Sequence, residues 1–217
     1  RLSAFIEKLS GTGSGKDSYD LVPEKRNEGF KCSSQVQYMA VCGNFREAGL
    51  DYHGAMKILK VILDYDYLWI RLRVKGGAYG CMSGFARNGE SYLVSYRDPN
   101  LGKTLEVYRN LPEYIRQFNA DEREMTKYII GTVSDLDIPR NPMETGARSM
   151  SAWMSGITEE TLQRERDQVL TAGPEQIRAL APAAEALLEE NALCVVGNDS
   201  RIEEERELFK EVKNLFH

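Results

Sequence analysis

The stretch that most restricts the fold of this chain is AYGCMSGFARNGESYLVSYRD, residues 78–98. Two strand-like runs flank the pair Asn88-Gly89, and both of these residues tolerate the positive φ angles that a two-residue type I′ turn requires. The pattern therefore predicts an antiparallel β-hairpin, and with it a fold that contains an antiparallel sheet.

Three other segments have a clear hydrophobic period. The run QVQYMAVC, residues 35–42, alternates with the period of two that is typical of a strand. In DYHGAMKILKVILDY, residues 51–65, the apolar residues Ala55, Ile58, Leu59 and Ile62 fall at helical spacing. The run ALCVVG, residues 192–197, predicts a short buried strand.

Capping residues and prolines predict where further helices begin and end. Asp98 followed by Pro99 is a favourable helix start, and Pro112 should interrupt the helix that follows. Asp121 with Glu124 forms a capping-box pattern for a helix that runs to about residue 136.

The last third of the chain reads as a loop, three helices and one strand. The stretch DIPRNPMETGARSM, residues 137–150, has two prolines and little periodicity, which indicates a surface loop. Helices are expected at about 159–170 and 175–188. After the strand at 192–197, Ser200 and Glu203 resemble a capping box for a C-terminal amphipathic helix.

We expect residues 1–26 to form an N-terminal helix and a linker, and residues 27–217 to form one domain. The glycine-rich SGTGSGK resembles a phosphate-binding P-loop, but Ser10 stands where the first glycine belongs and Asp17 follows Lys16 instead of a hydroxyl residue. The predicted fold class is α+β: a two-layer sandwich in which helices pack on one face of an antiparallel sheet.

Net charge and hydropathy exclude some classes of binding partner and a membrane-spanning segment. The formal net charge is -5 and no dense Lys/Arg run is present, which argues against nucleic acid or an anionic membrane and favours cationic or mixed-charge partners. No apolar stretch approaches the roughly 20 residues of a membrane span, and the first residues lack a signal-peptide core. We therefore expect a soluble, intracellular protein. The scattered cysteines are expected to be buried free thiols: Cys32, Cys42, Cys81 and Cys194.

Few residues offer catalytic chemistry by themselves. The two histidines, His53 and His217, lie far apart and in no zinc-binding motif, so we expect no metal site and no Ser-His or Cys-His pair. The paired acids Asp64 and Asp66, and the acidic run at 203–205, read as solvated helix faces.

The stretch RVKGGAYG, residues 73–80, allows two interpretations. In one, the glycines permit unusual dihedral angles where a strand begins, Arg73 and Lys75 point to water, and Tyr79 packs. In the other, Gly76 and Gly77 let a ligand's backbone approach while the guanidinium and phenol donate hydrogen bonds to a carbonyl or an oxyanion. Spacing does not decide between them.

Three segments together resemble a known family. The sequence LWIRLRVKGGAYG, preceded by NEGFKCSSQVQYMAVCGNF and followed by SYRDPNL, is similar to the last domain of the presequence-protease subgroup of the pitrilysin/insulinase-type zinc metalloendopeptidases. The similarity runs from about residue 27 to the C-terminus.

The resemblance implies an architecture and a metal. Family members have four related α+β domains in two halves that close around a chamber. The first domain carries the zinc motif HxxEH. That motif is absent here, and the chain begins at Arg1 rather than Met, so we expect an inactive C-terminal fragment whose partners are the N-terminal catalytic half, which holds the zinc, and an unfolded peptide substrate. The bacterial cytoplasm or an organelle lumen would suit such a protein.

The resemblance also assigns roles. Arg73 and Tyr79 would reach across the chamber, hydrogen-bond the scissile carbonyl and stabilise the developing oxyanion. Lys75, Gly76 and Gly77 would contribute to substrate binding, with the glycines allowing the substrate backbone to pass close to the strand.

Two other functions remain open from the sequence. The chain could be a non-catalytic assembly subunit that has kept a processing-peptidase-like fold, in which case Arg73 and Tyr79 would be structural. It could also be a small-molecule binding domain with Tyr79 in its pocket.

Overall fold

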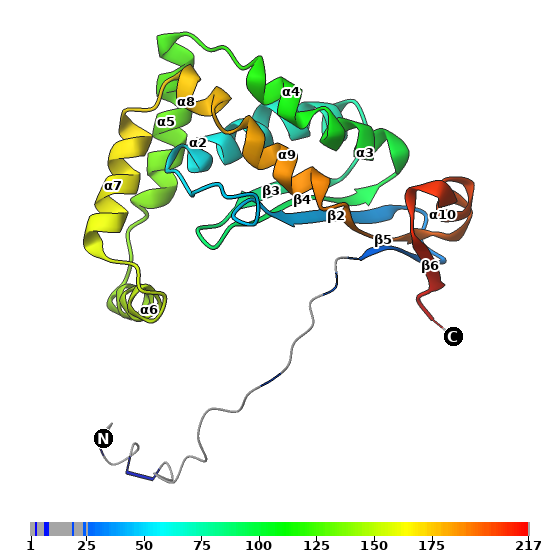
Figure 1. Ribbon diagram of the computed structural model, residues 1–217, viewed down its shortest axis with the longest axis horizontal. Coiled ribbons are helices and arrows are strands. Elements are labelled where there is room, and N and C mark those ends of the chain that lie inside the picture. The colour runs from blue at the N-terminus through cyan, green and yellow to red at the C-terminus, as the bar shows by residue number, and fades with distance from the viewer. Residues whose placement is uncertain (1–2, 4–6, 9–18, 20–23, 25, 217) are drawn as a thin grey trace.

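The computed structural model describes residues 3, 7–8, 19, 24 and 26–216, and these contain a six-stranded sheet (Figure 1). The strand order is β3-β4-β2-β5-β1-β6. The strands are β1 (Asn27–Cys32), β2 (Gln37–Asn44), β3 (Gly80–Phe85), β4 (Glu90–Asp98), β5 (Ala192–Asn198) and β6 (Glu211–Asn214). Pairing is antiparallel from β3 to β5, whereas β1 lies parallel to both β5 and β6.

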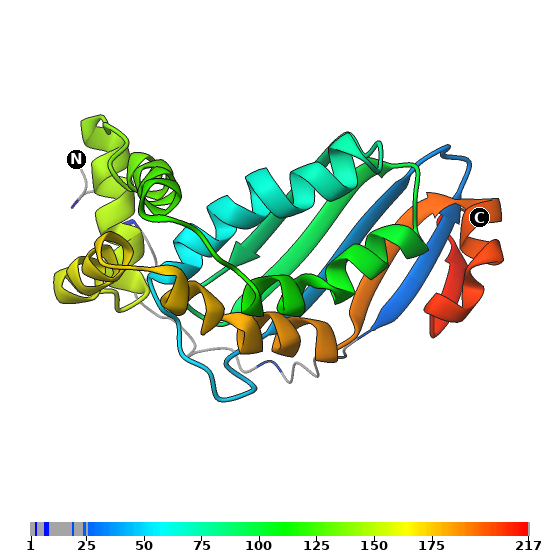
Figure 2. The same cartoon turned by 90° about the horizontal axis from the view of Figure 1, so that it is seen from above.

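Most of the helices lie over one face of this sheet, whereas the helices of residues 122–170 lie beyond one end of it, as Figures 1 and 2 show. The long first helix consists of α2 (Ala55–Ile62) and two π-helical stretches, η1 (Leu63–Tyr67) and η2 (Trp69–Val74). The other helices are α3 (Gly102–Arg109), α4 (Leu111–Arg116), α5 (Glu122–Leu136), α6 (Pro142–Met154), α7 (Glu159–Leu170), α8 (Pro174–Arg178), α9 (Ala181–Glu189), α10 (Asp199–Glu204) and the 3₁₀ turn η3 (Arg206–Leu208). The predicted α+β class is confirmed, with parallel pairs at one edge of the sheet.

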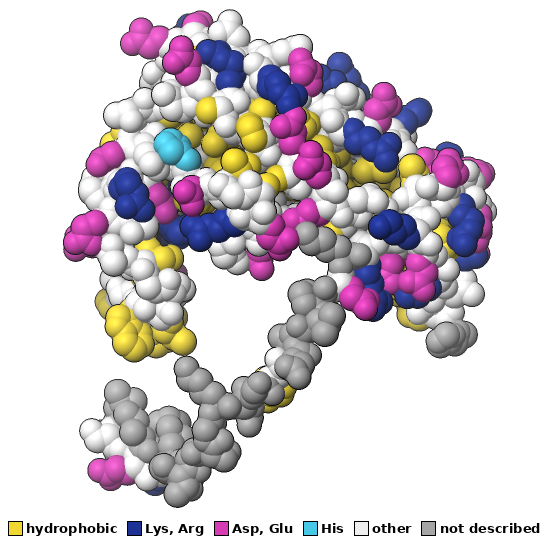
Figure 3. Space-filling view, in the orientation of Figure 1, with side chains coloured by type: hydrophobic (Ala, Val, Ile, Leu, Met, Phe, Trp, Pro, Cys, Tyr) yellow, Lys and Arg dark blue, Asp and Glu magenta, His cyan; other side chains and the backbone are white. Residues whose placement is uncertain are grey.

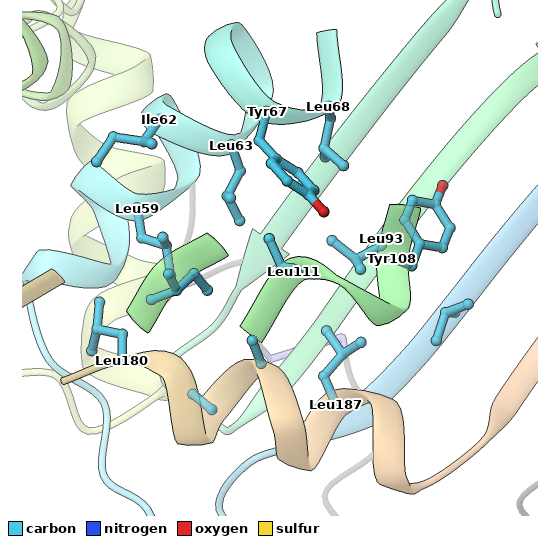
Figure 4. Packing of buried hydrophobic residues seen from close by; sticks show 14 of the residues in the cluster. Leu59, Ile62, Leu63, Tyr67, Leu68, Leu93, Tyr108, Leu111, Leu180 and Leu187 are labelled. Carbon is cyan, nitrogen blue, oxygen red and sulfur yellow. The ribbon is translucent and has the colours of Figure 1, made fainter. Parts of the chain in front are cut away.

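The core lies between the sheet and the long first helix. Leu59, Leu63 and Tyr67 point from this helix toward Leu93 of β4 and toward α4 and α9 (Figure 4). All of these side chains are almost completely buried. Burying one side chain of this size stabilises the fold by about 1.5–3 kcal/mol, so the face that carries them fixes the position of the whole helix.

The period-two pattern and the hairpin are confirmed, although the hairpin turn differs from the expected type. Met39 and Val41 of β2 face the core. In the hairpin, Ala86 donates its N–H to the carbonyl of Glu90 at 2.8 Å, and only Gly89 has positive φ, at +93°. This geometry is the three-residue loop with a left-handed glycine rather than a type I′ turn.

Several helix predictions are confirmed. The capping box of Asp121 and Glu124 opens α5, and Pro112 lies in the first turn of α4 after α3 has ended. The helix expected at 159–170 is α7. The helix expected at 175–188 is divided into α8 and α9, because a second proline, Pro182, begins a new helix.

Other predictions are wrong. Asp98 does not cap a helix: it ends β4, is fully buried, and α3 begins four residues later. The expected loop at 137–150 contains most of α6, which a capping box of Asn141 and Glu144 opens. The C-terminal helix is shorter than expected: Asn198 rather than Ser200 caps α10, which ends at Glu204, and the chain then pairs as β6 beside β1.

The cysteines are free but not buried. Cys42 and Cys194 are exposed on neighbouring strands β2 and β5, while Cys32 and Cys81 are half-buried. Burial, with a smaller contribution from Asp64, raises the pKa of the Cys81 thiol to about 11. The predicted N-terminal helix and glycine-rich linker lie almost entirely outside the described residues.

Candidate functional site

The stretch RVKGGAYG forms the end of the long helix and the turn that leads into β3. Arg73 and Val74 belong to η2, and β3 begins at Gly80, so the two glycines precede a strand as the first interpretation expects, but a helix comes before them. Lys75 donates its N–H to the carbonyl of Ile70 at 3.0 Å, a π-helical bond, and Ala78 donates to the carbonyl of Leu72 at 2.9 Å. The helix therefore ends in a tightly wound turn, and this turn leads into β3.

The two glycines are required by this turn. Gly77 has φ +83°, a left-handed conformation that favours glycine at a helix C-terminus. A Cβ atom on Gly76 would lie 2.5 Å from the carbonyl oxygen of Leu72. The close backbone approach expected of these glycines is thus made by the chain's own helix. Lys75 is exposed.

The turn brings Arg73 and Tyr79 together. Nη1 of Arg73 donates a hydrogen bond to the carbonyl oxygen of Tyr79 at 2.5 Å. The guanidinium carbon of Arg73 lies 4.3 Å from the ring centre of Trp69 and 5.5 Å from that of Tyr79. The Tyr79 side chain is well exposed, with 55% of the residue's surface accessible. Stacking on Trp69 and the bond to a carbonyl hold the guanidinium in place beside an accessible phenol.

Two further residues of the site come from the end of β4. The rings of Tyr79 and Tyr96 meet edge to face with centres 5.4 Å apart, and the guanidinium carbon of Arg97 lies 5.7 Å from the Tyr79 ring centre. Tyr79 also donates its N–H to the carbonyl of Arg97 at 3.2 Å. Sequence analysis missed Trp69, Tyr96 and Arg97. The SYRDPNL segment that supported the family resemblance contains two of them.

A β-bulge sets the direction of Arg97. Between Met39 and Gln37 of β2, the partner positions on β4 move from Ser95 to Asp98, so β4 has one residue more than β2 over this interval. Arg97 lies within this irregularity and has φ +49°, which is uncommon for a residue other than glycine. Bulges of this kind re-aim side chains and occur next to active sites.

Buried polar contacts fix the bulge to the turn. Asp98 is fully buried and accepts hydrogen bonds from the backbone N–H of Asn100 at 2.9 Å and from the hydroxyl of Thr104 at 2.7 Å. The side chain of Asn100 donates to the carbonyl of Gly76 at 2.6 Å. The end of β4 and the glycine turn are therefore joined directly, and the Arg73 and Tyr79 side chains rest on a rigid support.

The site can donate hydrogen bonds but cannot hold a catalytic metal by itself. Among the described residues, no group of three or more His, Cys, Asp or Glu side chains is arranged to bind a metal ion. A guanidinium with four remaining N–H donors and an exposed phenol suit an oxygen atom that carries or develops negative charge. These residues do not fit a zinc ion, so no reaction step is assigned to a metal held by this chain.

A hollow lies elsewhere. It has a volume of about 1000 Å³ and is lined by Arg140, just before α6, and by residues of α6, α7 and the turn between them, including Trp153 and Leu162. The hollow is wide open, and the buried contacts that anchor the Arg73–Tyr79 turn have no counterpart on α6, which has no buried residue. We therefore take the turn, rather than this hollow, as the candidate functional site.

Solved structures share this fold. A peptidase M16 inactive domain from Pseudomonas fluorescens superposes with a TM-score of 0.63 over 91% of this chain and 49% of that chain, at 16% identity. Pitrilysin superposes with a TM-score of 0.53 over 81% of this chain and 20% of that chain, at 12% identity. The fold is therefore that of an M16 peptidase domain.

Sequence similarity defines the family more closely. Residues 27–198 match the PreP C-terminal domain family, and the chain belongs to that family. It is 43% identical over 215 residues to Protein HypA of Clostridium perfringens, covering 99% of this chain and 22% of that protein. It is 33% identical over 192 residues to the chloroplastic/mitochondrial presequence protease 1 of Arabidopsis thaliana, covering 87% of this chain and 18% of that protein. The resemblance drawn from the sequence is confirmed, and the chain spans about a fifth of the length of these relatives.

Proposed function

We propose that this chain is the C-terminal, chamber-closing domain of a zinc metalloendopeptidase that degrades short unfolded peptides. In this role Arg73 and Tyr79 hydrogen-bond the carbonyl of the scissile peptide bond. The observation that carries the proposal is the fixed pair itself: an exposed phenol beside a guanidinium that is held by Trp69 and by the Tyr79 carbonyl. Membership of the PreP C-terminal domain family supports it.

Each side chain has a distinct part in the proposed chemistry. The phenol of Tyr79 donates to the carbonyl oxygen of the substrate, and this bond strengthens as the oxygen gains negative charge in the transition state. Arg73 keeps donors free after its bond to the backbone and adds a positive charge beside the same oxygen. Zinc, supplied by the catalytic half of the parent protein, would polarise the carbonyl and activate water.

The three neighbouring residues serve the site in different ways. Gly76 and Gly77 shape the turn that positions Arg73 and Tyr79, and the Gly76 carbonyl is already bonded to Asn100, so we do not assign it to substrate pairing. Lys75 is an exposed cation next to the turn and is proposed to contact the peptide. The catalytic half and the peptide are thus the partners of this surface, in a bacterial cytoplasm or an organelle lumen.

The experiment uses the full-length parent protein with matched zinc content. The kcat/KM for a quenched, unstructured peptide is compared between the unaltered protein, Tyr79→Phe and a matched control, Tyr65→Phe, which removes another exposed phenol on η1. We expect a loss of about 10²-fold or more for Tyr79→Phe, as for a lost transition-state donor. The control should retain the unaltered rate.

An unaltered rate in Tyr79→Phe would contradict the proposal. It would favour a non-catalytic assembly subunit, in which the pair is structural. Arg73→Gln provides the second test, since the proposal predicts a loss of cleavage without loss of folding, measured by thermal unfolding.

A further inference from the structure

We propose that Arg97 and Arg73 form a carboxylate-binding subsite around Tyr79, which binds a peptide carboxylate at or next to the scissile bond. This inference rests on the proposed function and adds a specificity residue to it. The juxtaposition that carries it is two guanidinium carbons at 5.5 Å and 5.7 Å from the centre of one exposed ring.

Neither of the two arginines has a carboxylate partner within the described part of the domain, in contrast to the arginines that connect its helices and hairpin. Arg87 pairs with Glu165, and Arg166 forms two hydrogen bonds with Asp137. Across the described residues, neither Arg73 nor Arg97 forms an ion pair with a carboxylate. Two uncompensated positive charges beside one ring therefore leave room for an anion from outside the domain.

The nearest acid in the sequence is not available to Arg97. Asp98 is fully buried, and its two carboxylate oxygens accept from Thr104 and Asn100. The acid thus holds the bulge in place while Arg97, one residue earlier, lies at the exposed Tyr79 ring. The Asp98 carboxylate therefore does not pair with the Arg97 guanidinium.

The backbone conformation of Arg97, with φ +49°, is energetically unfavourable for a residue other than glycine. A left-handed conformation at a non-glycine residue is unfavourable and persists where the surrounding contacts determine it, as the Asp98 contacts do here. Glycine or asparagine would adopt φ +49° more easily. An arginine at this position is best explained by what its side chain binds.

Carboxylate is the ligand chemistry that fits. A guanidinium presents paired N–H donors that match the two oxygens of a carboxylate, and such charge-assisted bonds are stronger than neutral ones. In a peptidase this carboxylate has two sources. It is an acidic side chain of the bound peptide, or it is the new C-terminal carboxylate that cleavage creates.

The experiment measures both sources on the full-length parent protein. In the first arm, kcat/KM is measured for two quenched, unstructured peptides that are identical except for Glu or Gln next to the cleaved bond. In the second arm, a product peptide that ends in a free carboxylate is compared with the same peptide as a carboxamide, each as an inhibitor. Each arm is run with the unaltered protein, Arg97→Asn, Arg97→Lys and the control Arg123→Gln, an exposed arginine on α5.

We expect the unaltered protein to favour the carboxylate form about tenfold in at least one arm, as for a lost charged hydrogen bond. Arg97→Asn, which tolerates the backbone conformation, should abolish the preference, and Arg97→Lys should retain part of it. The arm that shows the preference identifies the source. Arg123→Gln should leave it unchanged.

Two results would overturn the inference. One is an unaltered protein with no preference in either arm, a measurement that needs no variant to fold. The other is an undiminished preference in Arg97→Asn. If Tyr79→Phe has lost activity at the same time, only the subsite is rejected. If Tyr79→Phe is fully active, the proposed function fails first.

Discussion

Neither the turn at residues 73–79 nor the helix α6 has a regular hydrophobic period in its sequence. The two regions differ in how they contact the rest of the domain. A partly buried hydrogen bond from the Asn100 side chain to the Gly76 carbonyl joins the turn to the end of β4. Helix α6 has no buried residue, and Figure 3 shows hydrophobic side chains gathered on the surface in its region. The turn depends on tertiary contacts and α6 on local ones, so substitutions in the two regions should have different costs.

The largest stability effect is expected at Asp98. Asp98→Ala leaves the Thr104 hydroxyl and the Asn100 N–H without their buried acceptor and frees the bulge that carries Arg97. We predict a loss of about 3 kcal/mol in the free energy of unfolding. Denaturant unfolding of the 217-residue chain measures it, with Asp51→Ala, an exposed acid, as control. Equal stability of the two variants would show that the bulge is not held by Asp98.

The next effect concerns Glu165, which connects α7 to α2 and to the hairpin. Its buried carboxylate accepts from Lys57 and Arg87, each at a shortest distance of 2.5 Å. Glu165→Gln removes the charge that both cations require, and we predict a loss of about 2 kcal/mol at pH 7, measured by denaturant unfolding.

The Glu165 carboxylate should also make the stability of the chain depend on pH. Burial acts to raise the pKa of Glu165, but the hydrogen bonds and charges of Arg87 and Lys57 outweigh it and lower the pKa below its ordinary value. Stability from this carboxylate is therefore present above the ordinary glutamate pKa and is lost as the pH falls through the lower folded-state pKa. When the free energy of unfolding is measured from pH 7 downward, it should fall less in Glu165→Gln than in the unaltered chain. Parallel curves would contradict this.

A matched pair of glycine substitutions compares the two regions directly. Gly77→Ala places a side chain at φ +83° and should destabilise the chain by about 1 kcal/mol. Gly146→Ala lies within α6 with no atom within 4 Å of the added methyl group, and should stabilise it by about 0.5–1 kcal/mol. Thermal unfolding of both variants measures the signs. The same sign for both would remove the distinction between the two regions.

The smallest effect is expected at the surface of α6. Trp153 is 81% exposed. Trp153→Ala should change the free energy of unfolding by less than about 0.5 kcal/mol, because little buried area is lost. A loss above 1 kcal/mol in denaturant unfolding would mean that the ring packs against the domain.

The sequence predicted those helices, strands and turns that depend on a few neighbouring residues. The Asn88-Gly89 hairpin, the capping box of α5 and the helix break at Pro112 each depend on a few neighbouring residues. The capping box at Asn141 was equally local, but two prolines and little hydrophobic periodicity made α6 look like a loop.

The π-helical stretch could not be predicted in the same way. Its buried residues Leu63, Tyr67, Leu68 and Leu72 follow a wider spacing than an α-helix requires, since the bonds span five residues rather than four. Apolar runs of this length look alike in a strand and in a buried helix.

The candidate site was only partly predictable. Family resemblance supplied Arg73 and Tyr79, and the structure places them in contact. Arg97 joins the site through a positive φ and a bulge in the pairing of β4 with β2, which is a long-range contact with no signal in the neighbouring sequence. The spacing of residues along the sequence does not predict which side chains such contacts bring into the site.

The central claim is that the Arg73–Tyr79 turn acts on the transition state of peptide cleavage. The most direct measurement is the single-turnover cleavage rate of a quenched peptide by the full-length parent carrying Tyr79→Phe, together with the Kd of the same peptide. The account predicts that the single-turnover rate falls by about 10²-fold or more while the Kd changes little. An unchanged rate, or a loss that lies entirely in the Kd, would contradict it.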